Sequence, residues 1–249
     1  MNFIAIISKT DTYFKISEKF PIKISEKTLL NNLYLQVSKV FDVVYVATDN
    51  KKIIQEVEDF GGKAITLLKK HKTEIEKCCE AIEQIEIQEN KQFDVIINIF
   101  TEQALINTSQ LIELKNCFKQ KKPQIATLAK PINNQNDIFN TAKPKIVLNT
   151  QDEILYMSRK AIPFLKGQKE DKWVSKHLFY KHINIFGYRK DVLFEISKLS
   201  PNILEKAEHI EALRWLANGY KINVAFTEHE NVVIENIKDI EKIKQIGLL

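Results

Sequence analysis

The chain has 249 residues, 44% of them hydrophobic, which is enough to bury a sizeable core in one large domain or in a domain with a subdomain. Its 37 Lys and Arg residues exceed its 32 Asp and Glu residues and give a formal net charge of +5. The cations are spread along the chain without a basic block, which favours small anionic ligands and argues against a nucleic-acid groove. We therefore expect no nucleic-acid partner.

Cysteine use and hydropathy indicate a cytoplasmic protein. Cys78, Cys79 and Cys117 are too few and wrongly spaced for a zinc site or a disulfide framework, which fits a reducing compartment. No apolar run approaches the roughly 20 residues that span a bilayer, and the amino terminus lacks the features of a signal peptide. We expect no membrane partner.

The first strand and the loop that follows it are the stretch most typical of a ligand site. Residues 3–7 form a short apolar run that predicts a strand buried on both faces. Residues 8–25 show no helical periodicity and contain Lys15, Lys19 and Pro21. A basic loop at the carboxyl end of a central parallel strand favours phosphate binding. The alternative is a solvated surface loop in a lysine-rich protein.

Helices and strands alternate through the first half of the chain. Asp49 and Asn50 suit the start of a helix, Gly61 and Gly62 suit its end, and Thr73 opens a capping box. Alternation with short loops predicts right-handed crossovers and a largely parallel sheet with helices on both faces. We predict helices over residues 27–40, 51–60, 73–85 and 108–118, and strands over residues 3–7, 42–48, 64–67, 93–100 and 124–129.

The pattern changes after Pro131. Residues 133–137 mark an irregular break, and two apolar runs around a polar turn predict an antiparallel hairpin. We predict one domain over residues 1–249 with an insertion at about 133–181. A ribbon with exposed edges suits dimer contacts, so we expect this insertion to form a dimer interface. The hairpin strands are expected at 145–148 and 154–157, further strands at 183–188 and 222–226, and helices from 191, over 205–218 and from 236.

Several runs on these elements follow one known pattern. Residues 126–131 read Ala-Thr-Leu-Ala-Lys-Pro, and residues 156–163 read Tyr-Met-Ser-Arg-Lys-Ala-Ile-Pro. Residues 46–49 read Val-Ala-Thr-Asp, and residues 182–189 run from His182 to an arginine through a Gly-Tyr pair. With these runs the chain resembles the 3-deoxy-manno-octulosonate cytidylyltransferases, also called CMP-Kdo synthetases.

The resemblance implies a fold, a reaction and an assembly. The fold is an α/β nucleotidyltransferase of the glycosyltransferase-A-like kind, with a mostly parallel, doubly wound sheet and an antiparallel dimerisation ribbon. In the implied reaction, the anomeric hydroxyl of an acidic, Kdo-like sugar attacks the α-phosphorus of CTP and releases pyrophosphate, for lipopolysaccharide or surface-glycan synthesis. The implied assembly is a homodimer.

The resemblance also assigns the triphosphate site. Lys19 keeps the last lysine of the family's first loop, Lys15 replaces one arginine and Thr10 replaces another. Lys15 and Lys19 would neutralise the triphosphate, and Mg²⁺ would lie between Glu102 and Glu235, which replace two metal-binding aspartates. Glutamate is one methylene longer than aspartate, so two solvated loop acids are the alternative to a metal site.

Four further residues are expected to bind substrate, two of them at the sugar. Arg159 and His182 are the groups that the resemblance offers for the sugar carboxylate, and Glu208 and His71 also keep family positions. Arg159 and His182 each have a structural alternative. Arg159 could tie its own turn by bonding backbone carbonyls, and His182 could cap the strand that follows it. No partner for His71 is visible in the sequence.

Departures from the family pattern cluster at positions that face nucleotide or sugar in the family. They are Thr10, Ile75, Phe100, Thr101 and Ala212. Phe100 stands where the family has the glutamine that helps to read cytosine, and its ring cannot make that hydrogen bond. The alternative function is therefore a catalytically silent relative that binds a sugar, a nucleotide or a protein. A transferase with altered substrate choice is a third reading, favoured if Phe100 stacks on a base.

Overall fold

The structure is a computed structural model that describes residues 1–8, 23–24, 27–103, 105–121 and 123–230. The described residues fall into two compact units. Unit 1 contains the described residues up to Ile112, and unit 2 is Glu113–Glu230. The predicted α/β class is confirmed, since parallel pairings predominate among the central strands.

Unit 1 is built on a parallel sheet with the strand order β6-β1-β4-β5. Its strands are β1 (Phe3–Ser8), β4 (Val44–Thr48), β5 (Ala64–Thr66) and β6 (Val95–Phe100). Ile4, Ala5, Ile6 and Ile7 are fully buried, so β1 is covered on both faces, as its apolar run predicts. Ser8 pairs with Ala47 of β4 and with Phe100 of β6, which aligns the carboxyl ends of three strands.

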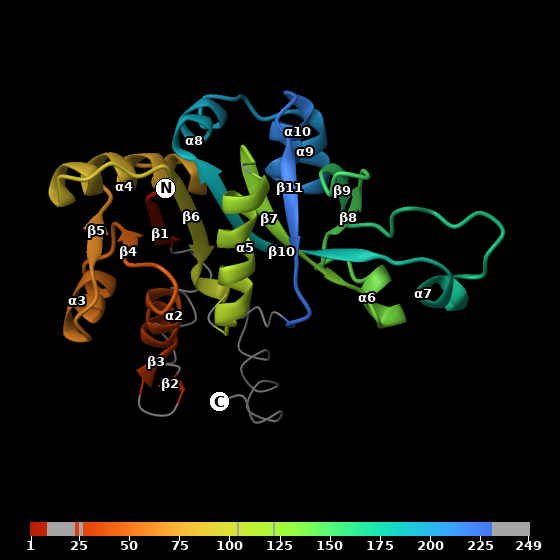
Figure 1. Cartoon of the computed structure of the whole chain (residues 1–249), viewed down its shortest axis with the longest axis horizontal. Helices are drawn as coiled ribbons and strands as arrows, with labels where there is room; N and C mark the ends of the chain where they lie inside the picture. Colours follow the sequence, from red (N-terminus) through yellow and green to blue (C-terminus); the bar gives the residue numbers. More distant parts are fainter. Residues whose placement is uncertain (9–22, 25–26, 104, 122, 231–249) are drawn as a thin grey trace. The chain divides into compact units, whose positions relative to one another are not determined.

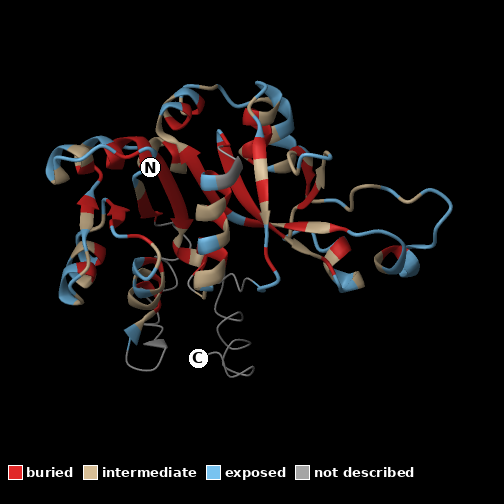
Figure 2. Ribbon diagram, in the orientation of Figure 1, coloured by how far each residue is buried: buried red, intermediate tan, exposed pale blue. Residues whose placement is uncertain are grey.

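Helices cover both faces of this sheet. In Figure 1, α4 lies along one face of β1, β4 and β5, and α2 and α3 lie on the other. Figure 2 shows that buried residues gather in the strands, while the outer sides of α3 and α4 are exposed. The helices of the first half are α2 (Leu29–Ser38), α3 (Lys51–Asp59), α4 (Glu74–Glu89) and α5 (Thr108–Lys121), with the 3-10 turn η1 (Thr101–Gln103) after β6.

Side-chain caps set where these helices begin. The Thr28 hydroxyl accepts a hydrogen bond from the Asn31 N–H (3.2 Å), and the Asn50 side chain accepts one from the Lys52 N–H (2.9 Å). Helix α2 starts two residues later than predicted. The two residues before it, Lys27 and Thr28, form strand β3, which pairs with β2 (Lys23–Ile24). The predicted cap at Thr73 is confirmed, since its hydroxyl accepts from the Glu76 N–H (3.2 Å).

Unit 2 contains a mixed sheet. Strand β7 (Ile125–Pro131) pairs in parallel with β11 (Ile222–Phe226) and antiparallel with β10 (Tyr180–Arg189). The predicted hairpin is confirmed as β8 (Lys145–Leu148) and β9 (Ile154–Ser158), and β8 also pairs with the start of β10. The helical segments are α6 (Gln135–Phe139), η2 (Glu170–Lys172), α7 (Trp173–Lys176), α8 (Lys190–Ile196), α9 (Ile203–Glu208) and α10 (Ala212–Ala217).

A small second core lies within the predicted insertion. Trp173 of α7 stacks on Phe179, with ring centroids 5.8 Å apart, and packs with Ile132 and Ile138. The expected irregular break at 133–137 is wrong in part, because Asn134 caps the short helix α6 by accepting from the Asn136 N–H (2.9 Å). The start of β10, α6 and α7 lie together in Figure 1. The single-domain assignment with an insertion stays a prediction.

The predicted helix over 205–218 is wrong. It is two helices, α9 and α10, separated at His209, whose φ of 51° is left-handed. The guanidinium of Arg159 donates to the carbonyls of Glu208 and His209 (2.7 and 3.1 Å). At the end of α9 these two carbonyls therefore accept from a side chain that belongs to neither helix. Arg214 holds α10 against α9 through a two-pronged ion pair with Glu205 (2.5 and 2.7 Å).

None of the helices in the described part of the chain has the length and apolar character needed to cross a bilayer. The helix expected from residue 236 lies outside the described residues.

Candidate active site

The carboxyl edge of the unit 1 sheet carries one group of predicted site residues. The Ser8 hydroxyl, at the end of β1, donates to Asn98 Oδ1 of β6 (2.7 Å), and both side chains are fully buried. This bond ties the ends of two strands from which the expected substrate loops depart. The predicted phosphate-binding residues Thr10, Lys15 and Lys19 lie outside the described residues.

Phe100 and Glu102 lie where β6 ends. Phe100 is the last residue of the strand and Glu102 is the middle residue of η1, and both are half-buried. This edge of the sheet therefore carries an aromatic residue, Phe100, and two positions further along an acidic residue, Glu102. The second predicted metal ligand, Glu235, lies outside the described residues.

The donor chemistry of Glu102 fits Mg²⁺. Magnesium is commonly held by one or two carboxylates together with substrate phosphates, rather than by an all-protein cage. Within the described residues no group of three or more His, Cys, Asp or Glu side chains could hold a metal. The metal assignment to Glu102 and Glu235 stays a prediction.

His71 lies in the loop after β5 and is held by an acid on α4. Its Nε2 bonds the carboxylate of Glu80, which also accepts from the backbone N–H groups of Leu68 (2.8 Å) and Lys69 (3.4 Å). Burial would raise the pKa of the Glu80 carboxyl, but the hydrogen bonds from His71 and the two N–H groups lower this pKa below its usual range. Glu80 thus shapes the loop, a role that the sequence pattern did not reveal.

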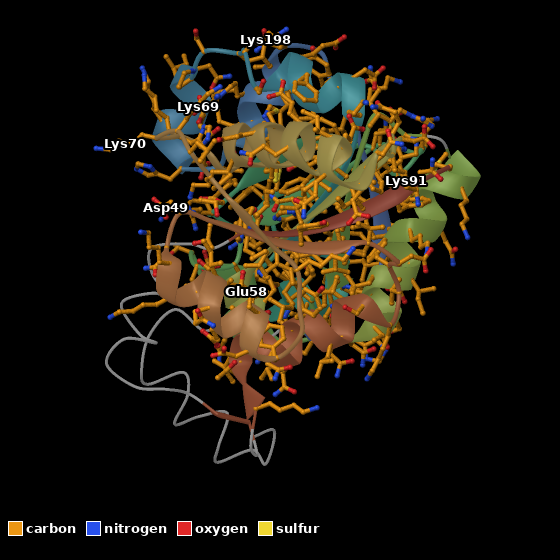
Figure 3. All side chains as sticks on the ribbon, turned by 90° about the vertical axis from the view of Figure 1, so that its left-hand side faces the viewer. Asp49, Glu58, Lys69, Lys70, Lys91 and Lys198 are labelled. Carbon is orange, nitrogen blue, oxygen red and sulfur yellow. The ribbon has the colours of Figure 1, made fainter. Side chains whose placement is uncertain are left out.

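Two further lysines lie at this edge. Figure 3 shows Asp49, Lys69 and Lys70 at one end of the unit 1 strands and Lys91 at the other. Lys69 and Lys70 are exposed and follow β5, so they add positive charge at the carboxyl edge. Their position directly after a predicted strand is the signal that could have identified them.

Arg159 and Glu208 meet in unit 2. The Glu208 carboxylate accepts from the Ser158 hydroxyl (2.6 Å) and from the backbone N–H of Arg159 (2.9 Å). The Arg159 guanidinium donates to the carbonyls of Glu208 (2.7 Å), Thr141 (3.2 Å) and His209 (3.1 Å). The structural alternative for Arg159, a tie to backbone carbonyls, is therefore observed.

Arg159 keeps capacity for a ligand. A guanidinium carries five N–H groups, and the three carbonyls in the described part of the chain take one each from Nε, Nη1 and Nη2. One N–H on Nη1 and one on Nη2 remain, and the side chain is half-buried. The structural tie and a contact with a carboxylate are thus compatible.

His182 lies on β10 and is a neutral imidazole. Its Nε2 is 2.8 Å from the Thr127 hydroxyl, which also donates to the Ile185 carbonyl (2.7 Å) at the irregularity in β10. The ring lies deep among protein atoms, although part of it reaches solvent. Burial lowers the pKa of His182 to about 3. His182 is therefore a hydrogen-bonding group rather than a cation at neutral pH.

Comparisons with known proteins agree over nearly the whole chain. A family model described as cytidylyltransferase matches residues 15–222. The 3-deoxy-manno-octulosonate cytidylyltransferase of Parabacteroides distasonis is 39% identical over 246 residues, which cover 97% of this chain and 96% of the relative. That of Bacteroides thetaiotaomicron is 38% identical over 236 residues, which cover 92% and 93%.

The chain belongs to the 3-deoxy-manno-octulosonate cytidylyltransferase family. It is a nucleotidyltransferase, as the resemblance in its motifs implied. A solved CMP:2-keto-3-deoxy-manno-octonic acid synthetase in complex with CTP matches with a TM-score of 0.84 and 25% identity, over 100% of this chain and 99% of that one. A 4-diphosphocytidyl-2C-methyl-D-erythritol synthase from Anaerococcus prevotii, 12% identical with a TM-score of 0.61, shares the fold.

The neutral state of His182 makes a prediction about stability. Because its pKa is about 3 in the folded chain and about 6.5 when unfolded, the unfolded chain binds more protons between these values. The contribution of neutral His182 to the free energy of unfolding is complete above pH 6.5, and it is lost as the pH falls below that value. From pH 6.5 to 5.5, urea denaturation should show that the wild type loses about 1 kcal/mol more unfolding free energy than His182→Gln. The exposed His177→Gln variant should follow the wild type, and equal losses in wild type and His182→Gln would contradict the assignment.

Proposed function

We propose that the chain transfers CMP from CTP to a Kdo-like acidic sugar and releases pyrophosphate. The observation that supports this most directly is the match to the 3-deoxy-manno-octulosonate cytidylyltransferase of Parabacteroides distasonis over 96% of that relative's length. The match to a solved CTP complex, with a TM-score of 0.84, supports it as well. The attacking group is the anomeric hydroxyl of the sugar, and the bond that breaks joins the α-phosphorus to the bridging oxygen of pyrophosphate.

The reaction needs charge neutralisation and alignment more than covalent catalysis. Lys15 and Lys19, which follow β1 in the sequence, are proposed to neutralise the triphosphate, and Thr10 is proposed to contact it through its hydroxyl. Glu102 and Glu235 would hold Mg²⁺, which when bound supplies polarisation of the phosphoryl oxygens. The half-buried position of Glu102 directly after β6 supports its part in this site.

Sugar recognition is assigned to unit 2. A carboxylate can take the two remaining N–H groups of Arg159, because a guanidinium suits bidentate binding. Neutral His182 can hydrogen-bond a sugar hydroxyl. Glu208 holds the backbone of Arg159 (2.9 Å), and His71 is proposed to act from its own loop, where Glu80 holds its Nε2.

Phe100 is assigned to the base. Its side chain lacks a hydrogen-bonding group, and its ring is half-buried at the end of β6. Stacking on a base uses what the ring offers, and base selection then depends on backbone groups. Such stacking would also favour the reading in which the choice of nucleotide is altered.

We also propose a setting for the reaction. Cys78, Cys79 and Cys117 are all buried thiols, which suits a reducing cytoplasm, where CTP is available. The product would supply the acidic sugar for lipopolysaccharide or another surface glycan.

Turnover tests the proposed function. Purified protein with Mg²⁺, CTP and Kdo should release one pyrophosphate for each CMP-sugar formed, measured by a coupled pyrophosphate assay. ATP, GTP and UTP in place of CTP, and neutral sugars in place of Kdo, serve as controls and should give at most about a hundredth of that rate. A folded protein without turnover of any pair would instead support the catalytically silent reading.

The metal proposal predicts a loss in Glu102→Gln. Removal of one ligand charge should lower Mg²⁺-dependent turnover by about a hundredfold and weaken Mg²⁺ binding to the protein–CTP complex, measured by calorimetry. Glu235→Gln should behave alike. Glu83→Gln, at an exposed position of α4, is the matched control and should retain both properties. Unchanged Mg²⁺ binding in both site variants would remove the metal assignment.

A homodimer formed through residues 133–181 is the proposed assembly. This region carries three large apolar side chains that are exposed, Phe164 (73% exposed), Leu178 (53%) and Phe139 (39%), and the two phenylalanine rings contact Trp173. Phe164→Asp combined with Leu178→Asp should convert a dimer to a monomer in sedimentation equilibrium, because charge in a buried apolar interface is costly. Ile87→Asp, 83% exposed on α4, should leave the dimer intact. A wild-type monomer would refute the proposal.

A further inference from the structure

Lys145 is a buried lysine to which the proposed reaction gives no task. It is the first residue of β8, and its side chain is fully buried. In the sheet it pairs with Ser158 of β9 and with Lys181 of β10. Its neighbour in the register, Ser158, directly precedes Arg159.

Three backbone carbonyls surround the Lys145 ammonium. Nζ donates to the carbonyls of Asn140 (2.7 Å), Lys143 (2.7 Å) and Arg159 (2.8 Å). An ammonium has three N–H groups, so each has one acceptor. Among the described residues no carboxylate forms an ion pair with this group. A buried cation that pairs only with carbonyls is costly, so its geometry has to be maintained by the groups around it.

The two segments that supply these carbonyls, residues 140–143 and the loop at Arg159, are also joined by the Arg159 side chain. Lys145 takes the Arg159 carbonyl, and the Arg159 side chain takes the carbonyl of Thr141, which lies between the other two acceptors of Lys145. The Glu208 carboxylate accepts from the Arg159 N–H (2.9 Å). The N–H, the carbonyl and the guanidinium of Arg159 are therefore all held, the N–H by the Glu208 carboxylate, the carbonyl by Lys145 and the guanidinium by three backbone carbonyls.

We propose that Lys145 is the positioning residue that holds Arg159 in the conformation in which its two remaining N–H groups face the sugar carboxylate. This inference rests on the proposed function of Arg159. Lys145 does not touch the sugar; it fixes the peptide from which the guanidinium projects. Its loss should therefore weaken sugar binding more than CTP binding.

The charge state of Lys145 adds a pH dependence to this role. Burial and the nearby Arg159 cation lower the pKa of Lys145 to about 8, while Asp137 of α6 and Glu208 of α9 act in the opposite direction. On β10, Lys181 faces the same region but is paired with Asp137 (3.1 Å) and Glu230 (2.5 Å). Above pH 8 the neutral amine has only two N–H groups, so one of the three carbonyls loses its donor.

The experiment compares Lys145→Met with Lys143→Met. Both variants replace a lysine of the same segment by an apolar chain of similar length, but the Lys143 side chain pairs with Asp137 (2.9 Å) and holds no part of Arg159. Lys145→Met should raise the KM for the sugar at least about tenfold and change the KM for CTP less than about twofold. Lys143→Met should change neither. A variant that only folds less completely would have a lower apparent kcat, with both KM values unchanged.

Two readouts complete the test. The wild-type KM for the sugar should rise above pH 8, and Lys145→Met should lack this rise. Trypsin should cleave after Arg159 and Lys160 about tenfold faster in Lys145→Met than in wild type or Lys143→Met, because the loop has lost a tie. If Lys145→Met fails to fold, Lys145→Gln, which keeps two N–H donors, replaces it with the same expected directions.

The outcomes separate this inference from the proposed function. Wild-type turnover with an unchanged sugar KM in Lys145→Met overturns the inference and leaves the proposed function intact. A wild type without turnover overturns the proposed function, and the tryptic cleavage rates then decide whether Lys145 holds the Arg159 loop. Equal cleavage rates in all three proteins overturn the inference in either case.

Discussion

The satisfaction of backbone carbonyls by two buried or half-buried cations organises unit 2. Lys145 takes three carbonyls and Arg159 takes three more, and these six groups come from segments far apart in the sequence. A carbonyl that is removed from water without a donor costs free energy, so the hairpin, the loop after it and the α9–α10 break stabilise one another. Glu208 completes this arrangement because it binds the Arg159 N–H.

This constraint bears on function because the residue at its centre is an expected sugar ligand. A side chain that only tied backbone would use its donors internally, and one that only bound ligand would be held by few neighbours. Arg159 is suited to both roles, since three N–H groups bond backbone carbonyls and two remain for a ligand. Preorganisation of this kind limits the rotamer entropy lost on binding.

In unit 1, the register of the parallel strands positions the predicted site residues. Parallel pairing of Ser8 with both Ala47 and Phe100 brings the ends of three strands to one edge. Glu80 then fixes the loop after β5 through His71 and two N–H groups. Phe100 and Glu102, two departures from the family pattern, lie at the end of β6, next to the buried bond between Ser8 and Asn98.

The sequence by itself determined the α/β class, the hairpin, the limits of β11, most helix starts and the family, because these depend on local patterns of apolar residues, caps and motif residues. Apolar periodicity cannot reveal which distant group satisfies a given carbonyl. The break at His209, the partner of His71 and the burial of Lys145 were decided only by tertiary structure. At His209 the donor is the Arg159 side chain, which is distant in the sequence, whereas His71 and Lys145 bond groups nearer in the sequence that no apolar pattern identifies. In each case it is the folded chain that brings donor and acceptor together.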